Sequence, residues 1–281
     1  MKKIGFIDSY LDEWHANNYP KWIRQSSRAG QFEVALAWQE VAPEGKKTLA
    51  QWCEAQGVGA AESLEQVVAE CDGLVILAPD DPERHEGLCD LPLRSGKPVF
   101  VDKTFAPDLA TAQRLFAKAE KHGTPLYSCS ALRYVESLES IVEQLAGRRA
   151  DFVATRGGGD WRNYAVHHLE PLVMLLGTGA RRVLHVGNPL ARFVVVDYPD
   201  GRRGSVLQAG FEFEFNVRCS DKALTVSDLG DFFPRFIEGM LAFFETREAP
   251  VPKEQTLEIM ALIEAGRNAL ATPDTWVAVP T

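Results

Sequence analysis

The feature that most constrains the fold is an alternation of short apolar runs with helical stretches over residues 1–127. The apolar runs that read as strands cover residues 3–7, 32–38, 73–79 and 97–103. The clearest helical stretch, residues 107–123, has Pro107 near its start and Gly123 at its end. Strands separated by helices of this length form parallel βαβ units. We therefore expect an N-terminal, doubly wound sheet of the Rossmann type.

The pattern changes after about residue 135. Segments 181–187, 191–210 and 211–220 read as consecutive strands, with a Pro-Asp-Gly hairpin turn inside the second. Phenylalanines alternate with polar residues in 211–216, which indicates a sheet with one apolar face. Two C-terminal helices, at 232–248 and 253–270, would cover that face.

These patterns predict an α/β chain of two domains. The first, residues 1–127, is a Rossmann-like domain of the dinucleotide-binding type. The second, residues 128–281, is an α+β domain with a mostly antiparallel, open-faced sheet that would serve substrate binding and oligomerisation.

Composition excludes several classes of partner. The net charge of −9 disfavours nucleic acid and anionic membrane surfaces. No apolar run approaches the roughly 20 residues that a membrane span requires. The five cysteines are scattered and form no C-x-x-C pair, which favours reduced thiols over disulfides or a zinc site. We expect a cytoplasmic protein that binds no nucleic acid and no membrane.

Ligands of a doubly wound sheet gather at the carboxyl ends of its strands. Polar residues follow the predicted strands at Asp8-Ser9-Tyr10, Gln39-Glu40, Pro79-Asp80-Asp81, Asp102-Lys103-Thr104 and Arg133-Tyr134. The candidate site therefore lies among these residues.

Residues 96–115, GKPVFVDKTFAPDLATAQRL, place a lysine directly after an apolar strand. A charge at a strand end is common on protein surfaces, so position alone does not indicate function. The stretch, however, resembles the signature GKHVFVEKPLA of the glucose-fructose oxidoreductase and inositol dehydrogenase family, Gfo/Idh/MocA. In this resemblance Asp102 stands for the glutamate, Lys103 for the lysine and Thr104 for the proline.

A second stretch, residues 157–177, resembles the substrate-domain motif of the same family, GGG-x-L-x-D-x-G-x-H-x-x-D. Aligned on the three glycines, Asn163 stands for the aspartate, His167 for the histidine and Glu170 for the terminal acid. The two motifs, in this order and at this separation, are fairly specific to the family.

Two shorter stretches extend the resemblance over nearly the whole chain. APDDPERHEG resembles a P-x-x-x-H loop of the family, with His85 as its histidine. SALRY resembles the N-x-R-Y/F end of a strand, with Arg133 and Tyr134 matching.

The resemblance implies an oxidoreductase that passes a hydride from a sugar or polyol carbon to NAD or NADP. The hydride leaves only as the hydroxyl proton departs, so a proton acceptor must lie within hydrogen-bond reach of that oxygen. The catalytic residues implied are Lys103, His167 and Asn163. The cofactor contacts implied are Asp8, Ser9, Tyr10, Glu40, Pro79, His85 and Asp102. The substrate contacts implied are Arg133, Tyr134, Trp161 and His168.

The first loop departs from the family pattern. The usual G-x-G-x-x-G/A lets the backbone approach a pyrophosphate at a helix N-terminus. Here the turn reads DSYLDEW and has no glycine. Asp8 would place a carboxylate, and Tyr10 added bulk, where the phosphates should lie. The alternative is that Asp8 points away or caps the next helix. We expect dinucleotide binding to be weak or lost.

Two other positions leave alternatives open. Asn163 can hydrogen-bond a hydroxyl but holds no charge and no proton, which would impair chemistry more than binding. Glu40 could contact an adenosine ribose or be a solvated strand-end charge. His167, His168 and Glu170 lie within one helical turn without a second cluster, so we expect no metal site.

Two functions remain open on these grounds. The first is a nicotinamide-dependent oxidoreductase acting on a hydroxylated small molecule. The second is a cofactor-impaired protein on the same fold that binds a sugar-like ligand or regulates a partner. In either case the half-polar second sheet suits a homodimer or homotetramer, although a solvated sheet face is equally consistent with it.

Overall fold

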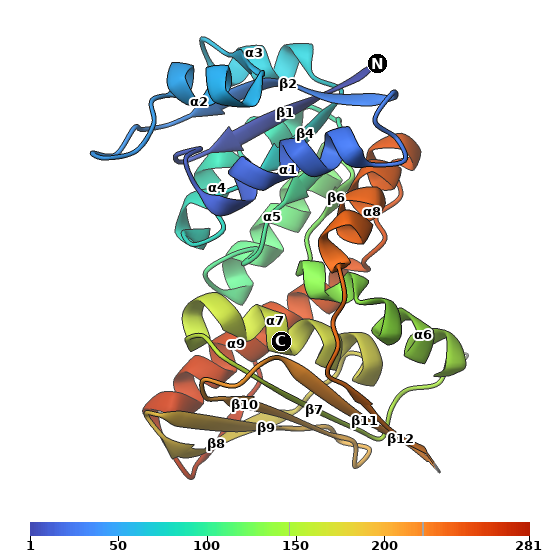
Figure 1. Cartoon of the computed structure of the whole chain (residues 1–281). Helices are drawn as coiled ribbons and strands as arrows, with labels where there is room; N and C mark the ends of the chain where they lie inside the picture. Colours follow the sequence, from blue (N-terminus) through green and yellow to red (C-terminus); the bar gives the residue numbers. More distant parts are fainter. Residues whose placement is uncertain (146, 221) are drawn as a thin grey trace. The chain divides into compact units, whose positions relative to one another are not determined.

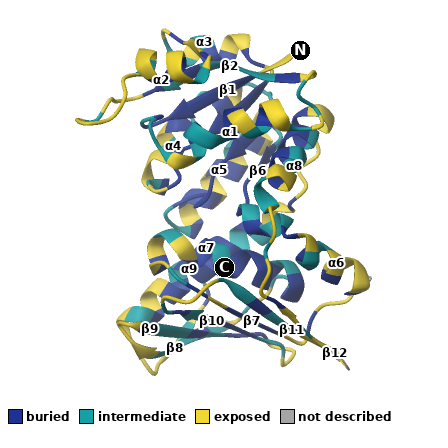
Figure 2. Ribbon diagram, viewed as in Figure 1, coloured by how far each residue is buried: buried dark blue, intermediate teal, exposed yellow. Residues whose placement is uncertain are grey.

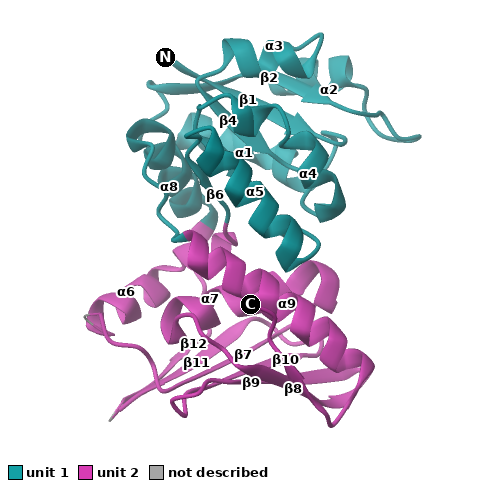
Figure 3. Cartoon of the chain, turned by 180° about the vertical axis from the view of Figure 1, so that it is seen from behind, with its two compact units in different colours: residues 1–128, 233–252 teal, residues 129–232, 253–281 magenta. Residues whose placement is uncertain are grey.

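The computed structural model describes residues 1–145, 147–220 and 222–281 (Figure 1). The chain divides into two compact units, coloured separately in Figure 3. Unit 1 comprises residues 1–128 and 233–252, and unit 2 comprises residues 129–232 and 253–281. The expected division after residue 127 differs from these units chiefly because residues 233–252 return to the first one. None of the described helices is long and apolar enough to cross a membrane.

Unit 1 contains a six-stranded sheet in the order β3-β2-β1-β4-β5-β6. Its strands are β1 (Lys2–Asp8), β2 (Phe32–Gln39), β3 (Gly59–Ala60), β4 (Gly73–Ile76), β5 (Val99–Val101) and β6 (Leu126–Tyr127). Every neighbouring pair runs parallel, which confirms the predicted Rossmann-type sheet. Because β1, β4 and β5 are neighbours, their carboxyl ends lie side by side at one edge.

The first five helices of unit 1 alternate with these strands, and the sixth comes from residues much later in the chain. They are α1 (Trp14–Gln25), α2 (Leu49–Gln56), α3 (Leu64–Glu70), α4 (His85–Leu88), α5 (Leu109–Lys121) and α8 (Phe232–Thr246). Thr48, Ser63 and Asp108 cap the starts of α2, α3 and α5 with their side chains. After the short α4 the chain forms a 3₁₀ turn at Pro92–Arg94 and not a longer helix, because a proline cannot donate within a helix.

Helix α8 belongs to unit 1. The expectation that the helix over 232–248 covers the second sheet is therefore wrong. The ring of Phe236 lies 5.4 Å from that of Phe100, and Phe243 lies 4.7 Å from Tyr127. Phe244 fills the space beside Gly73, where a Cβ atom would come within 2.9 Å of its ring. The apolar side of α8 is thus matched to β4, β5 and β6.

Unit 2 contains a seven-stranded sheet in the order β12-β11-β7-β10-β9-β8-β13. Its strands are β7 (Phe152–Gly157), β8 (Arg182–Asn188), β9 (Ala191–Asp197), β10 (Arg203–Gln208), β11 (Glu214–Cys219), β12 (Lys222–Val226) and β13 (Trp276–Ala278). Among the described strands of this second sheet only the β7–β10 pair is parallel, as expected for a mostly antiparallel sheet.

The helices of unit 2 are α6 (Glu136–Leu145), α7 (Trp161–Leu176) and α9 (Lys253–Ala271). The buried core of the unit follows α7 and the middle of its sheet, as Figure 2 shows, whereas the core of unit 1 follows β1 and β4. Trp161 packs closely on Gly266 and donates its indole N–H to the carbonyl oxygen of Ile263 at 3.0 Å, which fastens α7 to α9.

Two expected strand segments differ from the structure. Strand β11 begins only at Glu214, and Phe211, which is 47% exposed, precedes it together with Phe213. The stretch SALRY, expected at the end of a strand, lies beyond β6, which ends at Tyr127, and Ala131–Tyr134 form a 3₁₀ turn. Ser130 starts this turn by accepting the N–H of Leu132, a local bond that competes with strand pairing.

Candidate functional site

The loop between β1 and α1 occupies the place of the glycine-rich loop in dinucleotide-binding sheets. Strand β1 ends at Asp8 and α1 begins at Trp14. Counted from the strand end, the three glycine positions of G-x-G-x-x-G fall on Asp8, Tyr10 and Glu13. Each position therefore carries a side chain where the fold ordinarily needs none.

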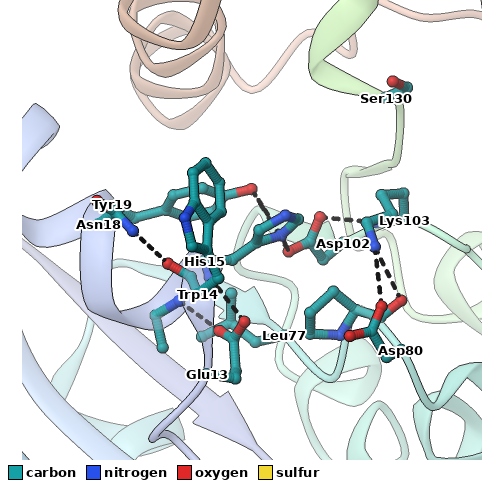
Figure 4. A network of polar contacts seen from close by, with 12 residues as sticks. Glu13, Trp14, His15, Asn18, Tyr19, Leu77, Asp80, Asp102, Lys103 and Ser130 are labelled. Carbon is teal, nitrogen blue, oxygen red and sulfur yellow. Dashed lines mark hydrogen bonds and ion pairs between the residues drawn. The ribbon is translucent and has the colours of Figure 1, made fainter. Parts of the chain in front are cut away.

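Glu13 is the cap of α1. Its carboxylate accepts the backbone N–H of His15 at 2.7 Å and that of Ala16 (Figure 4). Amides of the first turn are the donors that a pyrophosphate takes at the start of such a helix. Burial raises the pKa of Glu13 to about 7, although the nearby His15 opposes this. An acid of the chain itself thus occupies two amides of the anion-binding end.

Asp8 organises the loop and not the helix. Its side chain is fully buried, and its Oδ1 accepts the N–H of Tyr10 at 3.3 Å and the hydroxyl of Ser9 at 3.5 Å. Burial, followed by the charge of Glu13, raises the pKa of Asp8 well above its usual value. The predicted charge repulsion against phosphate is therefore weaker at Asp8 than its residue type suggests, and the helix cap proposed for it is provided by Glu13.

Asp102 joins the end of β5 to α1. Its Oδ2 is hydrogen-bonded to Nδ1 of His15, and the hydroxyl of Tyr19 lies 3.4 Å from the same oxygen (Figure 4). Tyr19 also stacks on the His15 ring, with centroids 5.2 Å apart. Burial alone would raise the pKa of Asp102, but His15 and then Lys103 outweigh it and hold the pKa below its usual value. Asp102 is therefore a buried carboxylate engaged within unit 1.

Lys103 is the buried cation at this edge of the sheet. Its side chain is 9% exposed, and Nζ donates to the carbonyl oxygen of Pro79 at 3.2 Å and to Oδ1 of Asp80 at 3.3 Å. Its backbone N–H donates to Oδ1 of Asp102 at 2.8 Å. The predicted residues Pro79, Asp102 and Lys103 are thus brought together, with Asp80 added to them (Figure 4).

Two other predicted cofactor contacts have partners within unit 1. The carboxylate of Glu40 binds the guanidinium of Arg84 through distances of 2.6 and 3.0 Å. His85 is fully buried, and its ring nitrogens lie 3.0 Å from the carbonyl oxygen of Phe105 and 2.5 Å from that of Leu77. His85 therefore ties the loop after β4 to the loop after β5, which is a structural role.

The second predicted cluster lies in unit 2 around Glu170. This buried carboxylate accepts Nη1 of Arg133 at 2.6 Å and the backbone N–H of Ser130 at 3.0 Å. The hydroxyl of Ser130 lies 2.7 Å from Nδ1 of the half-buried His167. Arg133 and His167 are thus positioned from the same short turn, and Tyr134 follows Arg133 in that turn.

Three other residues predicted in unit 2 have roles in packing or capping. The side-chain amide of Asn163 donates to Asp160, the cap of α7, at 3.3 Å. Trp161 lies in the core between α7 and α9. His168 is fully buried beside Phe213, and burial lowers its pKa to about 4. The buried Trp161 and His168 do not present the surface that a substrate contact requires.

Sequence reasoning missed Glu13, His15 and Tyr19. A signal was present, because Glu13 directly precedes the helical stretch, and His15 and Tyr19 are four residues apart on one helix face. What could not be predicted is that His15 and Tyr19 share the partner Asp102, which is distant in sequence. Lys103 belongs to unit 1 and His167 to unit 2, and their action on one substrate stays a prediction.

The first loop does not fit a dinucleotide pyrophosphate as its residues lie. Glu13 takes the amides of His15 and Ala16, and the buried carboxyl of Asp8 replaces the first glycine. Tyr10 adds a side chain where the backbone should approach the phosphates. Lys103 provides a cation at this edge of the sheet, but side chains of the first loop occupy the place where the pyrophosphate would bind.

A family model described as "Oxidoreductase family, NAD-binding Rossmann fold" (Gfo/Idh/MocA) matches residues 14–129, which lie almost wholly in unit 1. An uncharacterised protein, y4oX of Sinorhizobium fredii, is 27% identical over 154 residues. That match covers 47% of this chain and 42% of y4oX, so the chain spans less than half of this relative.

Solved structures share the fold over the whole chain. A probable dehydrogenase from Thermotoga maritima is similar with a TM-score of 0.82 at 12% identity, covering 99% of this chain and 98% of its own. Scyllo-inositol dehydrogenase of Lactobacillus casei, solved with NAD(H) and scyllo-inositol, has a TM-score of 0.82 at 13% identity, covering 100% and 99%. The WlbA dehydrogenase of Bordetella pertussis, solved with NADH and UDP-GlcNAcA, has a TM-score of 0.79 at 15% identity, covering 100% of both chains. At these identities the solved structures show that the chain shares their fold, and the family match extends over residues 14–129.

Proposed function

We propose that the protein is an oxidoreductase of the Gfo/Idh/MocA type that acts on a sugar, a polyol or a similarly hydroxylated small molecule. Lys103 is the cation at the reacting hydroxyl, and NAD or NADP is the cofactor, bound weakly. The proposed place of action is the cytoplasm, where the five cysteines, all free in the structure, stay reduced.

The observation that carries this proposal is the buried ammonium of Lys103 at the carboxyl edge of the sheet. An ammonium has three N–H donors. The described residues accept two of them, at Pro79 and at Asp80. Asp80 is 70% exposed at its side chain, so this ion pair is readily exchanged for another acceptor. Lys103 can therefore donate to a substrate oxygen and stabilise negative charge as its proton leaves.

Asp102 supports this role by fixing the backbone of Lys103. Its Oδ1 accepts the Lys103 N–H, and its Oδ2 is engaged by His15 and Tyr19. A carboxylate held from both sides keeps its rotamer, so the residue that follows it is held in one place. In unit 2, His167 is the second proton-handling group that we propose, because Ser130 holds its Nδ1 and thereby orients the ring.

A specific observation favours a second candidate, a cofactor-impaired protein that binds a sugar-like ligand. Asp8, Tyr10 and Glu13 at the three glycine positions, and the capping of α1 by Glu13, do not fit a pyrophosphate as they lie. In this case Lys103 would bind the ligand without turnover.

The experiment that separates the candidates begins with calorimetric titration of NAD⁺, NADH, NADP⁺ and NADPH into the protein. Turnover is then measured with a panel of inositols, hexoses and uronic acids. The oxidoreductase predicts dinucleotide binding and reduction of NAD⁺ or NADP⁺ by at least one member of the panel. If no heat is released at millimolar dinucleotide, the binding free energy is weaker than about −4 kcal/mol, and this result favours the ligand-binding protein.

The residue assignment is tested with Lys103→Ala, with Lys121→Ala in the last turn of α5 as the matched loss of an exposed lysine. We expect Lys103→Ala to abolish turnover and Lys121→Ala to retain it, while both keep the wild-type circular dichroism spectrum. Full turnover in Lys103→Ala would refute the assignment.

The open sheet of unit 2 is proposed as the surface of a homodimer or homotetramer. Arg181, Arg182 and Arg203 surround the buried carboxylate of Asp197 on β9, which gives the sheet a polar, charge-matched region. Sedimentation velocity at micromolar concentration should show a species larger than one chain. A monomer throughout that range would exclude this proposal.

A further inference from the structure

The starting observation is that an acidic side chain of the chain itself already occupies amides at the N-terminal end of α1. The carboxylate of Glu13 accepts the amides of His15 and Ala16, and the acid stands at the third glycine position of the family loop. A pyrophosphate bound in the usual way needs donors of this kind at the same helix end. A pyrophosphate bound in that way would need N–H groups that Glu13 already occupies.

We propose that Glu13 is an intramolecular competitor of the dinucleotide pyrophosphate, so that the cofactor binds only when this side chain leaves the first turn of α1. This deepens the proposed function and rests on it for the identity of the competing ligand. It makes Glu13 the residue that determines how tightly the protein holds a dinucleotide.

The surroundings of Glu13 explain why such a competitor is displaceable. Charged groups face it from three elements, namely Asp8 at the end of β1, His15 on α1 and Asp102 after β5. The two other acids disfavour its negative charge, and His15 favours it. A carboxylate that is half-buried beside other acids is held less firmly than an exposed cap would be. The hydrogen bonds from the two amides to Glu13 can therefore compete with a pyrophosphate and can also be broken when one binds.

The competition is not the repulsion first expected from Asp8. Asp8 is fully buried and bonds within its own loop, to Tyr10 and Ser9. Glu13 is half-buried and takes the amides directly. We therefore expect a substitution at Glu13 to change dinucleotide affinity, even though Glu13 does not directly follow β1.

The test is calorimetric titration of NAD⁺ into three full-length variants. Glu13→Gly restores the third glycine and frees both amides, and glycine is itself tolerated at a helix cap. Glu13→Gln keeps an acceptor of the same shape but removes its charge. Glu65→Ala is the matched control, because Glu65 is an exposed acid in the first turn of α3, on another helix of the same unit.

We expect Glu13→Gly to bind NAD⁺ at least ten-fold more tightly than the wild type, Glu13→Gln to lie between them, and Glu65→Ala to match the wild type. In ¹⁵N-labelled Glu13→Gly, addition of NAD⁺ should shift the amide resonances of His15 and Ala16. An unchanged affinity in Glu13→Gly, or tighter binding without a shift of these two resonances, overturns the proposal.

The readout separates this proposal from the proposed function. The competitor is judged by the ratio of affinities between Glu13→Gly and wild type, whichever of them turns substrate over. The oxidoreductase is judged by turnover of the wild type and its loss in Lys103→Ala. If the two affinities are nearly equal and the wild type turns substrate over, only the proposal about Glu13 is rejected. If Glu13→Gly binds much more tightly but the wild type shows no turnover, only the oxidoreductase is rejected.

Discussion

The imidazole of His15 and the carboxylate of Asp102 share a hydrogen bond that joins the first helix of unit 1 to the end of its fifth strand. The two residues are 87 positions apart in the chain. Both lie at the edge of the sheet where ligands of this fold bind, and Asp102 also receives the backbone N–H of Lys103. The His15–Asp102 pair therefore links the start of α1, where the first loop does not fit a pyrophosphate, to Lys103, the proposed cation.

Asp102→Asn should destabilise the protein by about 2–4 kcal/mol, because it removes the charged partner of a mostly buried imidazole. Chemical denaturation measures this loss. Asp90→Asn is the control, since Asp90 is 48% exposed and pairs with Arg94 and Lys118 at the surface. That control should lose less than about 1 kcal/mol. Equal losses in the two variants would show that the His15–Asp102 pair adds no stability.

The pH dependence of stability should carry the signature of Glu13. Its pKa in the folded chain is about 7, above the usual value of 4.5, so the folded state binds the extra proton between these pH values. The contribution of Glu13 is therefore fully favourable below about pH 4.5 and is lost as the pH rises towards 7.

Glu13→Gln, which cannot titrate, should remove this slope. The free energy of unfolding of the wild type, relative to Glu13→Gln, is expected to fall by about 1–3 kcal/mol from pH 5 to pH 8. Urea denaturation at a series of pH values gives the difference directly. Parallel curves for the two proteins would contradict the raised pKa.

The pair of Arg133 and Glu170 should be the most stability-critical ion pair of the candidate cluster in unit 2. Their side chains are 12% and 1% exposed, and the Nη1–Oε1 distance is 2.6 Å. Arg133→Met leaves a buried carboxylate without its cation, for which we expect a loss of about 3–5 kcal/mol.

The matched control for Arg133→Met is Arg156→Met, since Arg156 is 44% exposed and pairs with Glu214. Its loss should stay below about 1 kcal/mol. Thermal or urea unfolding compares the two variants. A similar small loss in Arg133→Met would mean that Glu170 is satisfied by Ser130 alone.

Gly266→Ala should loosen the contact between α7 and α9. A Cβ atom at this position would lie 2.0 Å from Cζ2 of Trp161, so the indole has to move in a packed core. We expect a loss of about 1–3 kcal/mol. Gly87→Ala in α4 meets nothing within 4 Å and should be neutral or slightly stabilising. If Gly266→Ala were equally neutral, the close packing of Trp161 would be refuted by differential scanning calorimetry.

Local patterning was sufficient for much of the fold. The alternation of apolar runs and helical stretches predicted the parallel sheet, and this sheet order alone places Lys103 at the ligand-bearing edge. The Pro-Asp-Gly turn predicted the hairpin of β9 and β10, which the structure confirms. Such features depend on residues close together in the sequence, and backbone geometry then leaves few alternatives.

The tertiary structure decided which partners distant residues meet. Helix α8 has an apolar side that could cover either sheet, and only the fit of its phenylalanines to Phe100, Tyr127 and Gly73 assigns it to unit 1. Likewise, the missing glycines of the first loop indicated that a pyrophosphate would bind poorly. They did not indicate that Glu13 would accept the amides of the helix. The sequence by itself thus determined the frame and the cation at its edge. The packing of residues far apart in the chain decided what fills the anion site, because burial and charge there depend on Asp8, His15 and Asp102 together.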